Sequence, residues 1–158
     1  MNLFDENRSQ TLIHQQGEVI YYSPVLSPES AAEYFNSLRH AVPWKRDTVK
    51  IFGRLRQTKR EVAWYGDEPY SYTYSNIQKL ALPWIRPLTE LKSLCEKVSG
   101  ETYNSCLLNL YHDGTEAMGW HSDDEPELMK DACIASLSLG ASRRFVFKHK
   151  SSGIIRVC

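Results

Sequence analysis

The sequence predicts an α+β fold. Two segments with helix signals lie before residue 102, and from Thr102 onward the apolar residues follow a period of two, which suits strands. With 158 residues, 42% of them hydrophobic and 24% charged, the chain has the size and composition of one compact domain with its own core. We therefore expect a single domain over residues 1–158, with its helices packed on a sheet.

The first helix is expected from Ser27 to about His40. Serine suits the cap position, Pro28 suits the first helical position, and Glu29 places an acid in the first turn. Pro43 lies just beyond the expected end and cannot continue a helix.

The second helix is expected from about Pro87 to Gly100, where glycine ends it. One face of this helix is apolar, through Leu88, Leu91, Cys95 and Val98. Short strands are expected at 18–23, 49–52, 62–65 and 70–74. Further strands are expected in SCLLNLY, around GWHSD, in CIASLSLG and in RRFVFKHK, with turns at Asp113-Gly114 and Gly140.

Composition points to an intracellular protein. No run approaches the roughly 18 apolar residues of a membrane helix, and the start lacks the basic and then apolar order of a signal peptide. We expect no membrane association, and a cytoplasmic location in a bacterium or a nuclear one in a eukaryote. The cysteines are scattered singly, so we interpret them as reduced thiols, mostly in the core: Cys95, Cys106, Cys133 and Cys158.

Charge is unevenly distributed, although the formal net charge is zero. Between Lys45 and Arg60 the chain has seven basic residues and a single acid, Asp47. Acids instead gather at residues 123–127. This asymmetry, and not the global charge, is what could favour a nucleic-acid partner.

His121-Ser122-Asp123 is the first chemical candidate. Side chains two apart on a strand point to the same side, so the imidazole and the carboxylate would face one point. Together they make two thirds of the facial triad that holds non-haem Fe(II). The alternative is an acidic surface loop after Trp120, and the triplet alone does not exclude it.

The strand before it offers a second pair of polar groups. The period of two places Leu107, Asn109 and Tyr111 on one face, which we expect to be interior, and Leu108 and Leu110 on the other. An amide and a phenol there could bind a small dicarboxylate. The alternative is an asparagine that closes a turn beside a tyrosine with its hydroxyl at the surface.

Two stretches resemble the core signature of the AlkB family of dioxygenases: NLYHDGTEAMGWHSDDEPEL and CIASLSLGASRRFVFKHK. Along the chain they contain, in this order, an N-x-Y strand, an H-x-D-D-E strand and an S-x-S-x-G-x-x-R-x-F hairpin. The similarity extends upstream through WYGDEPYSYTYS and IFGRL, to about Lys45. It implies an incomplete double-stranded β-helix, or jelly roll, with N-terminal helices packed on the sheet and a nucleotide-recognition lid. Residues 45–101 would form the recognition region and supporting helix, and residues 102–158 the first part of the jelly roll.

Carried over to this chain, the resemblance implies a role for each matching residue. His121 and Asp123 would bind Fe(II), and Asn109 and Tyr111 would contact the co-substrate 2-oxoglutarate. A further set would lie beside the target base: Tyr72, Thr73, Tyr74, Asp124 and Glu125. For the SYTYS run the alternative is an ordinary edge strand. At Tyr74 the base-contacting role and the edge strand have equal weight.

The IFG triplet resembles the hydrophobic finger of the duplex-repairing branch of the family. Such a finger fills the gap left by a flipped base, and basic neighbours hold the phosphates. Its residues would be Ile51, Phe52, Gly53, Arg54 and Arg60. Arg60 and the YGDEP stretch would also form part of the wall beside the lesion. The alternative is a buried strand with a solvated basic edge.

The implied function is oxidative demethylation of N-alkylated bases such as 1-methyladenine and 3-methylcytosine in DNA, coupled to decarboxylation of 2-oxoglutarate. The expected partner is alkylated DNA, with RNA as the alternative, and the expected state is a monomer. Competing interpretations are a lesion-binding module without catalysis and a protein-hydroxylating relative. The family's second metal histidine and its 2-oxoglutarate arginine find no match up to Cys158. We therefore expect a C-terminally truncated, inactive chain.

Overall fold

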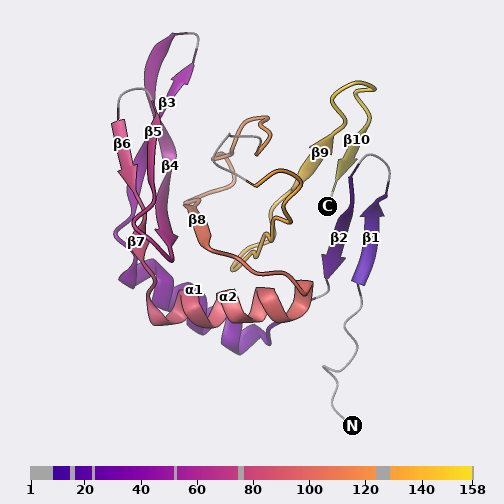
Figure 1. The fold of residues 1–158 in the computed structure, drawn as a ribbon, viewed down its shortest axis with the longest axis horizontal. Helices are drawn as coiled ribbons and strands as arrows, with labels where there is room; N and C mark the ends of the chain where they lie inside the picture. Colours follow the sequence, from indigo (N-terminus) through magenta and orange to yellow (C-terminus); the bar gives the residue numbers. More distant parts are fainter. Residues whose placement is uncertain are drawn as a thin grey trace. The chain divides into compact units, whose positions relative to one another are not determined.

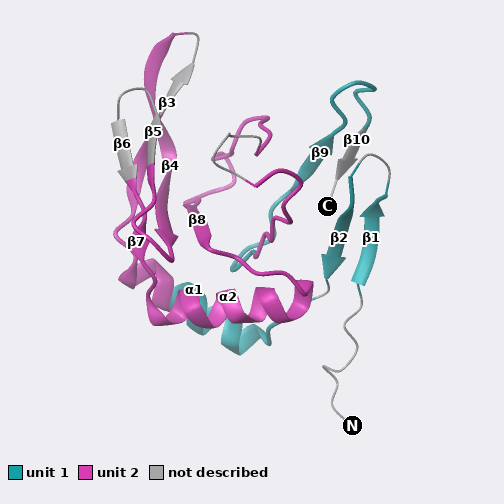
Figure 2. Cartoon of the chain, in the orientation of Figure 1, with its two compact units in different colours: residues 1–36, 138–158 teal, residues 37–137 magenta. Residues whose placement is uncertain are grey.

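The computed structural model describes residues 9–14, 17–22, 24–51, 53–74, 77–123 and 129–157, without the side chains of 49–51, 72–74, 77–79 and 155–157. These segments form helices and mostly antiparallel strands, as the predicted α+β class requires (Figure 1). The chain divides into two compact units, residues 1–36 with 138–158 and residues 37–137 (Figure 2). The single-domain assignment stays a prediction.

The main sheet lies in the second unit and is built around β4, Arg54–Gly66. This strand pairs antiparallel with β3, Lys45–Ile51, and with β8, Ser105–Leu110. A short strand, β7 at Leu82–Pro83, pairs with its end in parallel. A separate hairpin joins β5, Ser71–Tyr74, to β6, Ile77–Leu80.

A bulge interrupts the pairing of β3 with β4, because the register shifts between Arg46 and Thr48. The hydroxyl oxygen of Thr58 accepts the Asp47 N–H at 3.0 Å and lies 2.8 Å from the Arg60 carbonyl. This side chain therefore satisfies backbone groups that the ladder leaves unpaired, which is how a bulge is tolerated.

Both predicted helices are confirmed within about a residue. Helix α1 spans Pro28–Ala41, and the Ser30 N–H donates to the Ser27 side chain at 3.2 Å, as expected for a serine N-cap. Helix α2 spans Arg86–Ser99 and ends at Gly100, whose φ of 77° is the left-handed conformation that glycine adopts easily. In the described segments, neither helix has the length and apolar character to cross a membrane.

The buried apolar side chains of the second unit come chiefly from the end of α1, from β4 and from α2. The most buried of these is Tyr65 of β4, 2% exposed, and the other buried apolar residues are Leu38, Val42, Ala63, Ala81, Leu88 and Leu91. Lys92 of α2 forms an ion pair with Asp67, just beyond β4, and so ties the helix to the end of the central strand.

The first unit contains two short hairpins. In one, β1 at Ser9–Ile13 pairs with β2 at Val19–Tyr22; in the other, β9 at Val146–Lys148 pairs with β10 at Ile155–Val157. Gly140 lies close to the ring of Phe35, because a Cβ at this glycine would be 3.1 Å from the ring.

Several strand predictions were wrong. The segments around GWHSD and at 133–140 are irregular, and only residues 146–148 of RRFVFKHK form a strand. A period of two gives a strand only where a neighbouring strand completes its hydrogen bonds, and the described residues supply none for these segments. The expected core position of Cys133 was also wrong, because this thiol is exposed, whereas Cys95 and Cys106 are half-buried.

Candidate metal and co-substrate site

The metal candidates lie in the loop that follows β8, drawn in orange in Figure 1. The loop brings His121 and Asp123 together without a strand: Nε2 of the histidine lies 3.6 Å from Oδ1 of the aspartate. Both side chains are about half exposed, at 46% and 45%. The two side chains thus lie close together, although the extended strand that was expected to bring them together is absent.

The protons on His121 can be assigned from its other contact. Nδ1 lies 2.9 Å from the carbonyl oxygen of Gly119, and a carbonyl can only accept, so Nδ1 carries the hydrogen. In the neutral imidazole Nε2 then presents its lone pair to the Asp123 carboxylate. Either a metal ion or a second proton, which makes the ring an imidazolium, can stabilise this pair, and a backbone carbonyl that orients the ring is the usual support of a metal-binding histidine.

The donor set fits a divalent ion such as Fe(II). Neighbouring donors of an octahedral ion, each about 2.1 Å from it, lie about 3 Å apart. The observed 3.6 Å between the two side chains therefore leaves room for the ion after a small adjustment. Across the ranges that the structure describes, His, Cys, Asp and Glu do not gather in a group of three that could hold a metal.

The co-substrate candidates lie at the end of β8. Asn109 pairs with Val62 of β4, and Tyr111 is the first residue after the strand and is half-buried. Oδ1 of Asn109 is buried and has no hydrogen-bond partner among the described residues. An unsatisfied buried amide is costly, so a polar ligand bound at this position would be stabilising. Leu107, predicted to share an interior face with Asn109, is instead 56% exposed.

Arg60 is a buried basic residue in the bulge of β4, between Gln57 and Glu61, which pair with β3 on either side of the bulge. It is 5% exposed, and its Nη2 lies 3.8 Å from Oδ2 of Asp47. Within the described segments Nη1 has no hydrogen-bond partner. The guanidinium thus keeps donor capacity facing inward, whereas Arg54 and Arg56 of the same strand are exposed.

The predicted finger coincides with the turn between β3 and β4. Ile51 pairs with Arg54, and Gly53 has a φ of 76°, which favours glycine at this tight turn. The backbone of Ile51 closes the hairpin, and Phe52 lies outside the described residues.

The predicted base-contacting residues are only partly described. Tyr72, Thr73 and Tyr74 belong to β5, opposite Lys79, Gln78 and Ile77 of β6, but their side chains lie outside the described part, as do Asp124 and Glu125 altogether. Their roles stay predictions.

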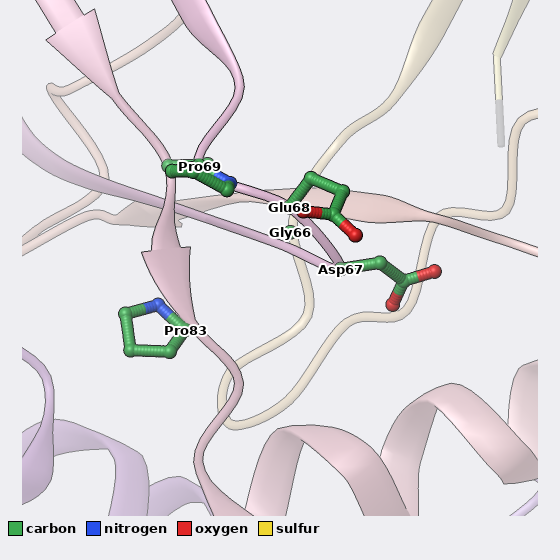
Figure 3. Close-up of a pocket in the computed structure, with 6 residues that line it drawn as sticks. Gly66, Asp67, Glu68, Pro69 and Pro83 are labelled. Carbon is green, nitrogen blue, oxygen red and sulfur yellow. The ribbon is translucent and has the colours of Figure 1, made fainter.

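The YGDEP segment lines a cavity of about 120 Å³ at the end of β4 (Figure 3). Its walls come from two segments: Gly66, Asp67, Glu68 and Pro69 on one side, Ala81 and Pro83 on the other. Asp67 accepts hydrogen bonds from the Trp84 indole at 2.7 Å and from Lys92 at 2.8 Å, and these donors lower the pKa of its carboxyl group.

One cluster was missed from the sequence. The position of His112 in the sequence matches no motif, but its ring lies between the carboxylates of Glu61 and Glu116. The available signal was the acid four residues after the histidine, but the partner on β4 is distant in sequence and could not be inferred.

Comparison with known proteins agrees with this chemistry. Residues 18–156 match the model of the 2OG-Fe(II) oxygenase superfamily. The DNA oxidative demethylase ALKBH2 of Homo sapiens is 36% identical over 143 residues, which cover 89% of this chain and 55% of the relative. The alpha-ketoglutarate-dependent dioxygenase alkB homolog 3 of Homo sapiens is 40% identical over 133 residues, covering 84% of this chain and 46% of the relative.

A plant relative gives the same result: the DNA oxidative demethylase ALKBH2 of Arabidopsis thaliana is 31% identical over 137 residues, which cover 84% of this chain and 44% of the relative. The chain therefore spans about half the length of the curated relatives that it matches. It belongs to the 2OG-Fe(II) oxygenase superfamily and, within it, to the AlkB family of dioxygenases, which use Fe(II) and 2-oxoglutarate.

Proposed function

We propose that this chain carries catalytic residues of a DNA demethylase. The reaction would remove N-alkyl groups from bases such as 1-methyladenine and 3-methylcytosine, coupled to decarboxylation of 2-oxoglutarate, in the repair of alkylated DNA. The observation that carries the proposal is the 3.6 Å distance between Nε2 of His121 and Oδ1 of Asp123, with Nδ1 of the same ring held by the Gly119 carbonyl. A histidine and a carboxylate at this spacing are two of the three ligands of the facial triad that binds non-haem Fe(II).

In this proposal His121 and Asp123 hold Fe(II), which together with 2-oxoglutarate supplies the oxidising chemistry. The Gly119 carbonyl keeps the imidazole in the tautomer that leaves Nε2 free to bind. The Asp123 carboxylate contributes negative charge that favours the divalent ion.

Asn109 and Tyr111 would hold 2-oxoglutarate. A half-turn of the Asn109 amide exchanges Oδ1 for Nδ2, so this buried position can present a donor to a carboxylate. The unsatisfied state of the amide supports this role, because a ligand would remove the cost of leaving it unpaired. The Tyr111 hydroxyl would donate to the same co-substrate.

The β3–β4 hairpin would contact the DNA. Exposed Arg54 and Arg56 can bind phosphates, while Ile51, Phe52 and Gly53 would fill the space of the flipped base. Arg60 would stand beside the lesion with its free Nη1 donor. Tyr72, Thr73 and Tyr74 would position the base, and Asp124 and Glu125 would favour the positive charge that methylation gives it.

The wider architecture in this proposal is a jelly roll, here incomplete, with a recognition lid over residues 45–101. We further propose a monomeric, intracellular protein. We propose duplex DNA over RNA as the substrate because the hairpin combines an apolar tip with flanking basic residues. This combination suits the unstacking of a base pair. Poor pairing of a methylated base would lower the cost of flipping it, a few kcal/mol for a normal base.

The first experiment measures metal binding by the chain, through Mn(II) titration followed by electron paramagnetic resonance. His121→Ala and Asp123→Asn should each weaken binding by at least about tenfold. His149→Ala is the matched control, because this histidine lies in the β9–β10 turn, bonded to Ser152, and should not change affinity. Unchanged binding in the His121 and Asp123 variants would refute the proposed metal site.

A second experiment separates catalysis from binding alone. A protein in which this chain is extended to the length of its relatives should, with Fe(II) and 2-oxoglutarate, release formaldehyde from a duplex that contains 1-methyladenine, and Asp123→Asn should abolish the release. Binding of that duplex without any formaldehyde would support the lesion-binding module instead. Its binding should depend on Arg54 and Arg56, which are exposed on β4.

A further inference from the structure

The imidazole of His112 bridges two structural elements. Its Nε2 lies 3.1 Å from Oε2 of Glu61, on the central strand β4. Its Nδ1 lies 3.0 Å from Oε2 and 3.2 Å from Oε1 of Glu116, in the loop after β8. One ring therefore links the loop to the sheet.

The geometry determines the charge of this ring. Each carboxylate can only accept hydrogen bonds, so both ring nitrogens must carry a hydrogen for both contacts to be made. Only the imidazolium does so. In the neutral ring, one nitrogen would face a carboxylate with its lone pair and that contact would become repulsive.

Glu116 makes the bridge costly to lose. Its side chain is 7% exposed, and its Oε2 also accepts the backbone N–H of His112 at 2.9 Å. A buried carboxylate that loses its cationic partner keeps the cost of desolvation without the compensating attraction. We therefore expect the loop to move when the ring loses its charge.

The loop itself is a closed turn. The backbone N–H and the hydroxyl of Thr115 donate to Oδ1 of Asp113 at 2.7 and 2.6 Å, and the Glu116 N–H donates to the Asp113 carbonyl at 3.4 Å. Because the turn is held together internally, the His112 bridge fixes residues 112–116 as one piece against β4.

This piece lies between the two candidate pairs. Tyr111 directly precedes it, and His121 and Asp123 follow in the same loop. We propose that His112, as a cation held between Glu61 and Glu116, is a positioning residue that orients Tyr111 for 2-oxoglutarate. The inference rests on the proposed function of Tyr111, but the bridge itself can be tested without any ligand.

The surrounding charges determine the pH dependence. Glu116 and then Glu61 raise the pKa of His112, Glu116 most strongly, and Asp113 lies next to Glu116 with Lys59 nearby. A raised pKa in the folded state means that the bridge contributes its full stability below the unfolded value of about 6.5. That contribution is lost as pH rises through the higher folded value.

The ligand-free test measures amide hydrogen exchange of residues 112–116 in the whole chain, together with the ring nitrogen shifts of His112. At pH 6 the ring should carry two N–H groups, and His112→Gln should accelerate exchange by about tenfold. The difference should shrink as the ring deprotonates. His112→Lys should restore protection without the pH dependence, and Glu61→Gln should lower the pKa of His112 while leaving the turn formed.

The co-substrate test measures 2-oxoglutarate affinity with Mn(II) bound. Wild-type affinity should fall by several fold as His112 deprotonates, and His112→Gln should give the lower affinity at every pH. Equal exchange and equal affinity in wild type and His112→Gln would overturn the inference. If the wild type binds no 2-oxoglutarate, the proposed function fails, and a bridge detected by exchange would then have no positioning role.

Discussion

The ammonium of Lys92 lies 2.8 Å from Oδ1 of Asp67, the same oxygen that accepts the Trp84 indole hydrogen at 2.7 Å. The ammonium also lies 5.1 Å from the centre of the Trp84 ring, within the range of a cation–π interaction. These contacts join α2 to the end of β4 beside the cavity of the YGDEP segment. Asp67 therefore connects α2 to the end of β4 and also lines the cavity.

Asp67→Asn should therefore lower the melting temperature by about 2–4 °C. The amide keeps its shape but loses the charge that attracts Lys92. The pKa of Asp67 is lowered in the folded state, chiefly by Lys92, so the wild-type advantage should exist above the unfolded value of about 3.9. It should disappear as pH falls through the folded value.

Thermal denaturation between pH 3 and pH 7 tests this. The control is Arg86→Gln, which removes an ion pair with Glu90 in which the arginine side chain is 91% exposed and should change the melting temperature little. An equal effect of both substitutions would show that Asp67 is no more than a surface charge.

Asn109→Leu should stabilise the chain while removing co-substrate binding. Leucine has the same number and branching of side-chain heavy atoms, although it is larger, and it eliminates the buried Oδ1 that lacks a partner in the described structure. Replacing an unsatisfied polar group by an apolar one should raise the free energy of unfolding by about 1 kcal/mol. Affinity for 2-oxoglutarate with Mn(II) should fall by at least about tenfold.

Urea denaturation and calorimetric titration measure the two effects. Asn104→Leu is the control, because Asn104 is exposed and bonds to the Tyr70 hydroxyl at 3.4 Å, so no gain in stability is expected. A destabilised Asn109→Leu chain would mean that the amide has a protein partner instead of a ligand.

Local signals explain what the sequence could predict. Ser27 and Gly100 define helix ends through their own backbone chemistry, so α1 and α2 were placed within about a residue. The His121–Asp123 pair could also be predicted, because only one residue separates its members. Sequence spacing was informative here even though the loop is not a strand.

Long-range partners explain what could not be predicted. Strand β4 extends to Arg54 because β3 pairs with it, and residues 133–140 remain irregular because no described strand pairs with them. The His112 bridge depends on Glu61, which only the pairing of β4 with β8 brings close. Alternation of residues along one segment contains none of this information.

Gly140→Ala should destabilise the chain more than Gly153→Ala. Both glycines have positive φ, 85° and 70°, so alanine costs about 1–2 kcal/mol at either position. Only at Gly140 would the new Cβ also lie 3.1 Å from the Phe35 ring, which adds about 1 kcal/mol of crowding. Urea denaturation of the two variants isolates this contact. Equal losses would indicate that the ring moves aside freely.

Cysteine reactivity should report the packing of β8 against α2. Burial, with a further contribution from Cys95, raises the pKa of Cys106 to about 12, although Lys92 opposes the shift. At pH 8 almost none of this thiol is the reactive thiolate. Cys133 is exposed, with its sulfur 3.6 Å from the Tyr103 hydroxyl, so a reagent can reach it.

Iodoacetamide at pH 8, followed by peptide mass spectrometry, should therefore modify Cys133 at least about tenfold faster than Cys106. In urea the two rates should converge, because unfolding removes the burial that raises the pKa of Cys106. Rapid alkylation of Cys106 in the native chain would instead show that β8 separates from α2 in solution. The position of Asn109 and Tyr111 at the end of that strand would then vary, and the co-substrate site would need a ligand to form.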